Sequence, residues 1–101
     1  MATVTSKVMA RIAAATSSTT LYTVPASTTA VVTNIVVTNS ASSAATFTIT
    51  LDSVDLFKDC AIAANTTALF DLKQVLATTK IIAGLASAIT VKFQISGVEI
   101  V

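Results

Sequence analysis

The sequence contains no histidine and no tryptophan, a single cysteine, two glycines, one proline and only 11% charged residues. Without histidine, a Ser/His/Asp or Cys/His catalytic arrangement lacks its general base. The single cysteine, Cys60, cannot form an intrachain disulfide, which is typical of proteins that fold in a reducing compartment. We therefore expect that the chain is not an enzyme and that it binds no cofactor and no metal.

The charges that are present nearly balance, because six Lys and Arg residues face five Asp and Glu residues and leave a net charge of +1. They are dispersed along the chain, and residues 12–51 carry none. A weak and dispersed charge gives no electrostatic footprint for nucleic acid, so we expect no nucleic-acid partner. A surface rich in Ser, Thr and Ala predicts instead a protein that lies against other proteins.

The mean hydropathy is high, at +0.83, yet no segment has the length that crosses a membrane. The longest apolar run, Ile81–Ala86, has six residues, whereas a spanning helix needs about 20. We therefore expect no membrane partner. Near the N-terminus, Arg11 interrupts the only stretch that could act as a secretion signal, so we expect the chain to be made and folded in a cytoplasm.

Apolar and polar residues alternate with a period of two over residues 45–52 and 89–96. This period places the two sets of side chains on opposite faces of a strand. In the first stretch we expect a core face and a wet face, formed respectively by Phe47, Ile49 and Leu51 and by Thr46, Thr48 and Thr50. In the second stretch the expected core set is Ile89, Val91, Phe93 and Ile95.

Residues 29–39 are apolar on both faces, which predicts a strand in the middle of the assembly or one covered by a neighbour. We expect Val31, Ile35 and Val37 on one face and Val32 and Val36 on the other. A loop is expected at residues 39–44 and a tight turn at residues 52–53. Further strands are expected at residues 7–13, 20–24, 54–57, 66–72 and 80–85.

About eight strands with few Gly or Pro residues require turns built on Asp, Asn and Ser. A chain of this length supports one modest core. We therefore expect one all-β domain over residues 1–101, a jelly-roll-like antiparallel β-sandwich with residues 1–6 as an arm. Residues 72–86 also fit helical spacing, but their β-branched pairs favour strand.

Three aspartates, Asp52, Asp55 and Asp59, suggest a calcium loop by their number. The segment lacks the glycine and the alternate oxygen ligands that such a loop needs, so solvated turn residues are favoured. Asp71 and Glu99 would suit an acid–base pair, but no pattern brings them together, and isolated exposed carboxylates are expected.

Three further residues invite a functional interpretation. Cys60 has no base to activate it and is expected to be a buried small hydrophobe. Asn65 begins a glycosylation sequon, for which a turn entering the next strand is the favoured interpretation. Tyr22 is expected to place its ring in the core and its hydroxyl at a sheet margin, rather than to stack on a ligand.

The segments TLYTVPA (residues 20–26) and TAVVTNIVVTN (residues 29–39) resemble the opening of small tailed-bacteriophage virion proteins. The resemblance continues through IAANTT (residues 62–67) and ISGVEI (residues 95–100), and covers roughly residues 19–101. Members of this family are β-sandwich subunits of capsid decoration or of tail and fibre parts. The chain departs from them after residue 26 and near residues 78–79, where relatives often carry glycine.

The resemblance implies a virion structural protein, made in a host cytoplasm, and implies no catalytic, cofactor-binding or metal-binding residue. We expect a capsid decoration or cement subunit that stabilises a phage head by protein–protein contacts. The alternatives are a tail, fibre or baseplate subunit, and a carbohydrate-binding host-attachment module with exposed aromatics near its loops. Expected partners are the chain itself, as dimer or trimer, and the major capsid protein or other virion proteins, because few charges protect the strand edges.

Overall fold

The computed structural model describes residues 3–101, in which eight strands and no helix are found. The strands are β1 (Val4–Ala13), β2 (Thr19–Thr23), β3 (Thr29–Asn39), β4 (Ala45–Leu51), β5 (Val54–Ile62), β6 (Thr66–Leu76), β7 (Ile81–Ala86) and β8 (Val91–Ile100). Among these residues there is no helix with the length and apolarity needed to cross a membrane.

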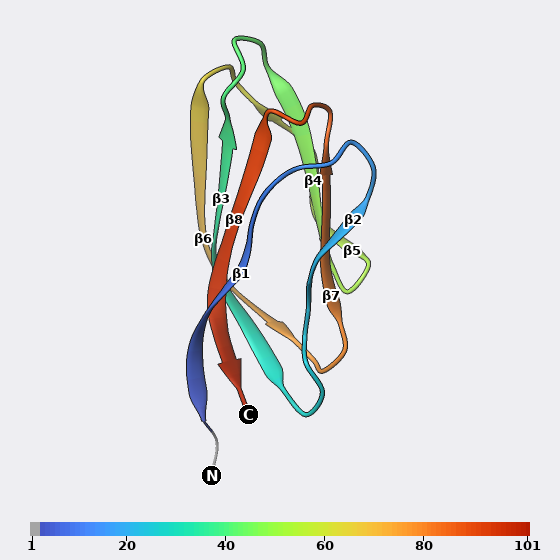
Figure 1. Cartoon of the computed structure of the whole chain (residues 1–101), viewed down its shortest axis with the longest axis vertical. Coiled ribbons are helices and arrows are strands. Elements are labelled where there is room, and N and C mark those ends of the chain that lie inside the picture. Colours follow the sequence, from blue (N-terminus) through green and yellow to red (C-terminus); the bar gives the residue numbers. More distant parts are fainter. Residues whose placement is uncertain (1–2) are drawn as a thin grey trace.

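The strands form two antiparallel sheets that face each other in a sandwich 49 Å long (Figure 1). The first sheet has the order β1-β8-β3-β6, and the second has the order β2-β7-β4-β5. Each sheet thus joins strands from both halves of the chain, which is the arrangement of an eight-stranded jelly roll. The expected fold class, an all-β antiparallel sandwich of jelly-roll type, is confirmed.

The core lies between the sheets and is built by the alternating strands. Phe47 and Ile49 on β4 and Phe93 and Ile95 on β8 are almost completely buried, as their period predicts. The Phe47 ring lies 6.2 Å from the Phe93 ring across the sandwich and 5.8 Å from Phe57. Tilted aromatic contacts of this kind contribute about 0.5–1.5 kcal/mol each beyond the burial of their area. The contact between Phe47 and Phe93 joins the two sheets, and the contact between Phe47 and Phe57 joins β4 to β5 within the second sheet.

The expected faces of β3 are wrong in one respect, because a bulge reverses the alternation. The register with both neighbouring strands shifts between Val32 and Asn34, which leaves Thr33 as the additional residue. An additional residue turns every side chain before it to the other face. Val32 is therefore in the core with Ile35, whereas Val31 points outward.

The expected wet face of β4 is also wrong at its centre, since Thr48 is only 4% exposed. A bulge on β5 places two residues, Lys58 and Asp59, opposite Thr48. The backbone N–H of Asp59 donates to Thr48 Oγ1 at 3.0 Å, and Asp59 has a φ of 47°. The Thr48 hydroxyl thus accepts a hydrogen bond from a backbone N–H group of the bulge instead of facing water. Thr46 and Thr50 on the same face are half-buried.

Several strand boundaries differ from the sequence prediction. β1 begins at Val4, three residues early, so the expected arm over residues 1–6 overlaps the paired strand, and residues 1 and 2 lie outside the described part. β5 and β6 are longer than expected, because tertiary pairing extends them.

Ile89, expected in the core, is 69% exposed in the β7–β8 loop. The strand interpretation of residues 72–86 is confirmed, with a turn between β6 and β7.

The β4–β5 hairpin has the tight turn that was expected. Asp52 and Ser53 have φ values of 53° and 64°, which are typical of the two central residues of a type I′ turn. Aspartate and serine tolerate this left-handed conformation less well than glycine, but the twist of the turn matches that of the flanking strands.

Candidate interaction surfaces

The three aspartates that were considered as a calcium loop lie in three different parts of the structure. Asp52 lies in the β4–β5 turn, where its carboxylate is 3.7 Å from Lys80 Nζ. Asp55 is an exposed residue of β5, and Asp59 belongs to the bulge. Within residues 3–101, His, Cys, Asp and Glu side chains form no group of three that could hold a metal ion.

Cys60 and Asn65 have structural positions close to those expected. Cys60 is half-buried, less than predicted, and packs against the core opposite Phe47. Asn65 has a φ of 52° in the turn before β6, and its backbone N–H donates to the Ala41 carbonyl at 3.0 Å. The interpretation of Asn65 as a turn residue is confirmed.

Tyr22 connects the two sheets. Its ring is 9% exposed, and its hydroxyl donates a hydrogen bond to the carboxylate of Glu99 on β8. Burial of the ring, reinforced by Glu99, raises the pKa of the Tyr22 hydroxyl above its usual range. The predicted position of Tyr22 is confirmed, whereas the expectation that Glu99 is isolated and exposed is wrong.

Asp71 and Glu99 are not brought together. Glu99 lies opposite the buried Ala30 in the first sheet and so faces the second sheet. Asp71 is an exposed residue of β6, in register with Asn34. The two carboxylates therefore point to opposite sides of the first sheet.

Asn39, at the end of β3, organises one end of the sandwich and was missed from the sequence. Its side chain is fully buried. Its Nδ2 donates to the Ser43 carbonyl at 2.9 Å, and its Oδ1 accepts from the Ala41 N–H at 3.1 Å and from Thr90 Oγ1 at 3.2 Å. The β3–β4 and β7–β8 loops are thereby held together. An asparagine that ends a long apolar strand is the only local signal of this role.

The outer side of the first sheet carries an aliphatic surface, here called the valine face. Val31 on β3 pairs in register with Val75 on β6 and with Val98 on β8. Val4 and Val75 remain 64% and 67% exposed. An uncharged exposed strip of this kind on a sheet is unusual for a surface that faces only water. The valine face consists of Val4, Val8, Val31, Val75, Val98 and Ile100.

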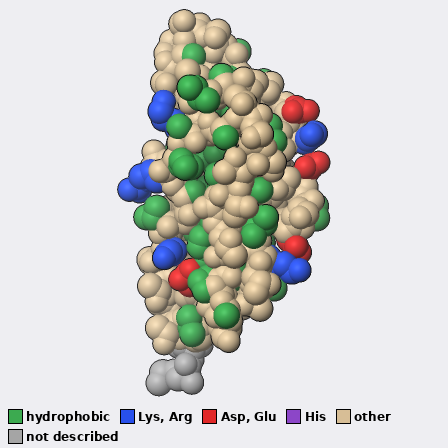
Figure 2. Space-filling view, turned by 45° about the vertical axis from the view of Figure 1, so that its right-hand side comes forward, with side chains coloured by type: hydrophobic (Ala, Val, Ile, Leu, Met, Phe, Trp, Pro, Cys, Tyr) green, Lys and Arg blue, Asp and Glu red, His purple; other side chains and the backbone are tan. Residues whose placement is uncertain are grey.

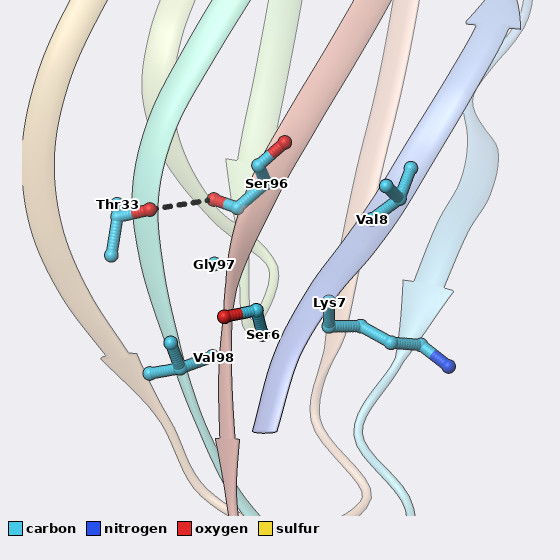
Figure 3. Close-up of a pocket in the computed structure, with 7 residues that line it drawn as sticks. All are labelled: Ser6, Lys7, Val8, Thr33, Ser96, Gly97 and Val98. Atoms are coloured by element: carbon cyan, nitrogen blue, oxygen red, sulfur yellow. Dashed lines mark hydrogen bonds between the residues drawn. The ribbon is translucent and has the colours of Figure 1, made fainter. Parts of the chain in front are cut away.

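A groove of about 360 Å³ runs along the valine face between β1, β8 and β3 (Figure 3). The bulged Thr33 donates its hydroxyl to the Ser96 carbonyl at 3.2 Å across this groove. At Gly97 a Cβ atom would collide with the Val31 carbonyl oxygen, so only glycine allows the strands to approach here. Lys7 is the single charged residue of the lining.

The outer side of the second sheet carries mostly small, uncharged side chains along β4 and β7. This surface is here called the threonine face. Thr50 pairs with Ala83, and Thr48 pairs with Leu85. Figure 2 shows a largely uncharged surface across the middle of the molecule, with charged side chains along its two long sides. The threonine face consists of the half-buried residues Thr46, Thr50 and Leu85, and Thr48 and Ala83 are buried between them.

No protein-family model matches the sequence, and no curated protein matches it either. Solved structures do share its fold. A chain of the T13 particle of infectious bursal disease virus superposes with a TM-score of 0.57 at 11% identity, over 98% of this chain and 30% of that chain. A chain of the Gx strain of that virus gives 0.52 at 16% identity, over 98% and 32%.

A pentameric capsid protein isolated from metagenomic phage sequences gives a TM-score of 0.41 at 18% identity, over 97% of this chain and 59% of that chain. The present chain spans about a third of the length of the infectious bursal disease virus chains. At these identities the likeness concerns the fold. The fold of this chain is therefore a jelly roll similar to those in chains of a virus particle.

Proposed function

We propose that this chain is a structural protein of a virion, and that in a phage particle it acts as a capsid decoration or cement subunit. The observation that carries the proposal is the strand order β1-β8-β3-β6 over β2-β7-β4-β5, because the same jelly-roll fold occurs in chains of a virus particle. Its partners are other copies of itself and the major capsid protein. Nucleic acid and membrane take no part.

The two outer faces supply the contacts that such a role needs. The residues of the valine face and of the threonine face are uncharged, although Asp71 and Lys92 lie on the same side of the first sheet as the valine face. A protein–protein interface has the same anatomy, with an apolar centre and a polar rim. A contact that buries 1,000 Å² or more is typical of a specific interface, and the aliphatic part of it stabilises by roughly 25 cal/mol per Å² before the costs of association.

The carbohydrate-binding alternative is disfavoured by the aromatic residues. Sugar sites commonly present an exposed aromatic side chain near loops. Tyr22, Phe47 and Phe93 are buried, and Phe57 and Phe70 pack against the core with their ring centroids 4.4 Å apart. All five aromatic residues of the chain are thus committed to the interior. A tail, fibre or baseplate subunit remains the second virion role, without an observation that favours it.

The proposal is tested on purified particles. Mass spectrometry of density-purified virions from the culture that produces this chain is expected to detect it at a fixed ratio to the major capsid protein. Cryo-electron microscopy is expected to place it on the outside of the head. Particles from which the chain has been deleted should release their genome at a lower temperature. Absence of the chain from particles contradicts the proposal, and location in the tail selects the second virion role.

A further inference from the structure

The free edge of β6 is open to pairing with another strand. The edge strands of the two sheets are β1 and β6 in the first and β2 and β5 in the second. Among residues 3–101, β6 pairs with β3 alone, and Figure 1 shows it along one side of the molecule with no strand beyond it. An edge strand presents a row of unpaired N–H and C=O groups to which another chain can bind.

The other three edges carry features by which natural sheets prevent such pairing, namely bulges, short strands and lysines. β1 has a register shift near its middle and contains Lys7. β2 has only five residues and is interrupted at Leu21. β5 shifts its register twice and contains Lys58. Residues 66–71 of β6, in contrast, pair with β3 at six consecutive positions and contain no lysine, arginine or proline.

The side chains of residues 66–71 alternate between the two faces of the first sheet. Thr67, Leu69 and Asp71 lie on the outer face and are exposed. Ala68 and Phe70 face the second sheet, where they are half-buried and pack against the core. With an exposed fraction of 73%, Leu69 is the most exposed large hydrophobic residue among residues 3–101. An apolar side chain thus lies at the middle of an unprotected edge.

We propose that two copies of this chain join through antiparallel β6 strands, with residues 66–72 of one copy against the same residues of the other and Leu69 on the two-fold axis. Edge pairing of this kind unites the two first sheets into one continuous sheet. The same surface meets itself, so the contact closes with two copies. This deepens the proposed function and rests on its statement that copies of the chain are partners. The expected dimer suits this contact, and the expected trimer does not.

The position of the axis follows from the residues that would face each other. Paired residues point to the same face, so the axis passes through one residue and not between two. An axis at Phe70 places Asp71 opposite Leu69, and an axis at Asp71 places two carboxylates opposite each other, which is unfavourable. An axis at Ala68 shortens the pairing, because β6 begins two residues before it. An axis at Leu72 lies where the register of β6 with β3 shifts.

An axis at Leu69 gives compatible pairs along the whole segment. The two Leu69 side chains meet on the outer face and cover each other. Asp71 of each copy lies opposite Thr67 of the other, whose hydroxyl can donate to the carboxylate. The two carboxylates are then four residues apart along the strands, about 13 Å, which exceeds the Debye length of about 8 Å at physiological salt. On the inner side, the small Ala68 lies opposite the Phe70 ring.

The contact leaves the valine face of each copy accessible. A two-fold axis perpendicular to the joined sheet keeps the outer faces of both copies on the same side. Val75 lies six residues beyond Leu69, about 20 Å along an extended strand, and therefore outside the paired segment. A dimer thus presents two valine faces to one side, where both can meet the shell to which the proposed function assigns them.

Substitutions on the outer face of β6 test the contact. Sedimentation velocity of the full chain is expected to show two copies of the 10.3 kDa protein. L69K is expected to raise the dissociation constant about tenfold or more, because two lysines then face each other on a strand edge. V75K is the matched control, because Val75 is similarly exposed on the same face of the same strand. It should dimerise like wild type.

Position 67 tests the register. T67K places a lysine opposite Asp71 of the other copy and is expected to lower the dissociation constant about threefold or more. T67D places like charges opposite each other and should raise it by a similar factor. Urea denaturation in dilute solution is expected to show that all these variants remain folded, since the substituted side chains are exposed.

The outcomes separate this contact from the proposed function. A monomer at millimolar concentration, a trimer, or equal dissociation constants of L69K and V75K overturns the contact. Equal dissociation constants of T67K and T67D overturn the register with Leu69 on the axis. If the chain is in particles but is monomeric in solution, only this contact fails. If a dimer forms that L69K dissociates, but particles lack the chain, only the proposed function fails.

Discussion

At the scale of single residues, position across the sheet decides which threonine matters. Thr46 and Thr50 lie on the outer face of β4 with no hydrogen bond from the bulge, whereas Thr48 is buried and accepts from the Asp59 N–H. The period-two alternation of the sequence predicts the same exposed position for all three threonines. The bulge on β5 makes one of them a structural residue, because a buried hydroxyl that satisfies a backbone group is costly to remove.

Replacement of Thr48 by alanine is therefore expected to reduce the free energy of unfolding by about 1–2 kcal/mol. Phe47→Ala, next to it in the core, should reduce it by about 3–5 kcal/mol, and Thr46→Ala should have little effect. Urea denaturation of the three variants measures these differences. Equal midpoints for Thr48→Ala and Thr46→Ala would show that the bulge does not depend on this hydroxyl.

Tyr22 gives the stability a dependence on alkaline pH. The folded-state pKa of the hydroxyl is raised above the ordinary value of 10.0, so the folded protein holds the proton more tightly than the unfolded chain. This contribution is fully present below pH 10 and is lost as the pH rises above it. We expect the free energy of unfolding to fall as the pH rises from about 10, and to fall less in Tyr22→Phe. Lysines also titrate in this range, so the difference between the two proteins is the quantity to measure. Parallel curves would exclude a role of Tyr22.

At the scale of elements, one buried side chain holds the loops at one end of the sandwich. Asn39 bonds Ser43 and Ala41 in the loop that follows β3 and Thr90 in the loop before β8. These loops are short of apolar residues and have few other means of ordering themselves. Their conformation is therefore linked to a residue that lies in the neighbouring strand.

Asn39→Ala is expected to reduce the free energy of unfolding by about 2–3 kcal/mol, because it leaves several buried backbone groups without partners. Hydrogen exchange should rise in both loops at once. The matched control is Asn34→Ala, since the Asn34 Oδ1 atom is buried without a partner and its removal breaks no hydrogen bond of that atom. Faster exchange in only one loop would mean that Asn39 does not couple them.

At the scale of the whole molecule, the valine face is the surface that the proposed function assigns to contact with a shell. Val31 on β3 pairs with Val75 on β6 and with Val98 on β8, and Val4 and Val75 are 64% and 67% exposed. Asp71 and Lys92 lie on the same side of the first sheet, so the valine face is an apolar strip within a surface that also carries charge. A charge placed within the strip should therefore weaken a contact made through it.

Val75→Asp, on the valine face, is expected to leave the stability of the chain within about 0.5 kcal/mol, because Val75 is mostly exposed. It should weaken binding to particles that lack the chain, since it places a charge in an apolar contact. Cosedimentation with such particles measures the effect, and sedimentation of the variant alone should show the same oligomeric state as wild type. Ile89→Asp, in the β7–β8 loop, is the control. Equal binding of Val75→Asp and wild type would exclude the valine face as the docking surface.

The sequence by itself determined the all-β class, the approximate number of strands and most of the core. Alternation with a period of two is a local property, and the burial of Phe47, Phe93 and Ile95 follows from it directly. The turn at Asp52 and Ser53 and the burial of the Tyr22 ring could likewise be predicted from neighbouring residues in the sequence. The absence of histidine was visible without a structure.

The tertiary structure alone decided which face each side chain takes beyond a bulge, and which distant residues meet. A bulge depends on how two strands pair, so Thr33 and Asp59 have no signature in the sequence. The hydrogen bond between Tyr22 and Glu99 and the contacts of Asn39 join residues far apart in the chain. The two candidate surfaces likewise arise from strand order, because neighbouring strands of a jelly roll come from opposite halves of the sequence.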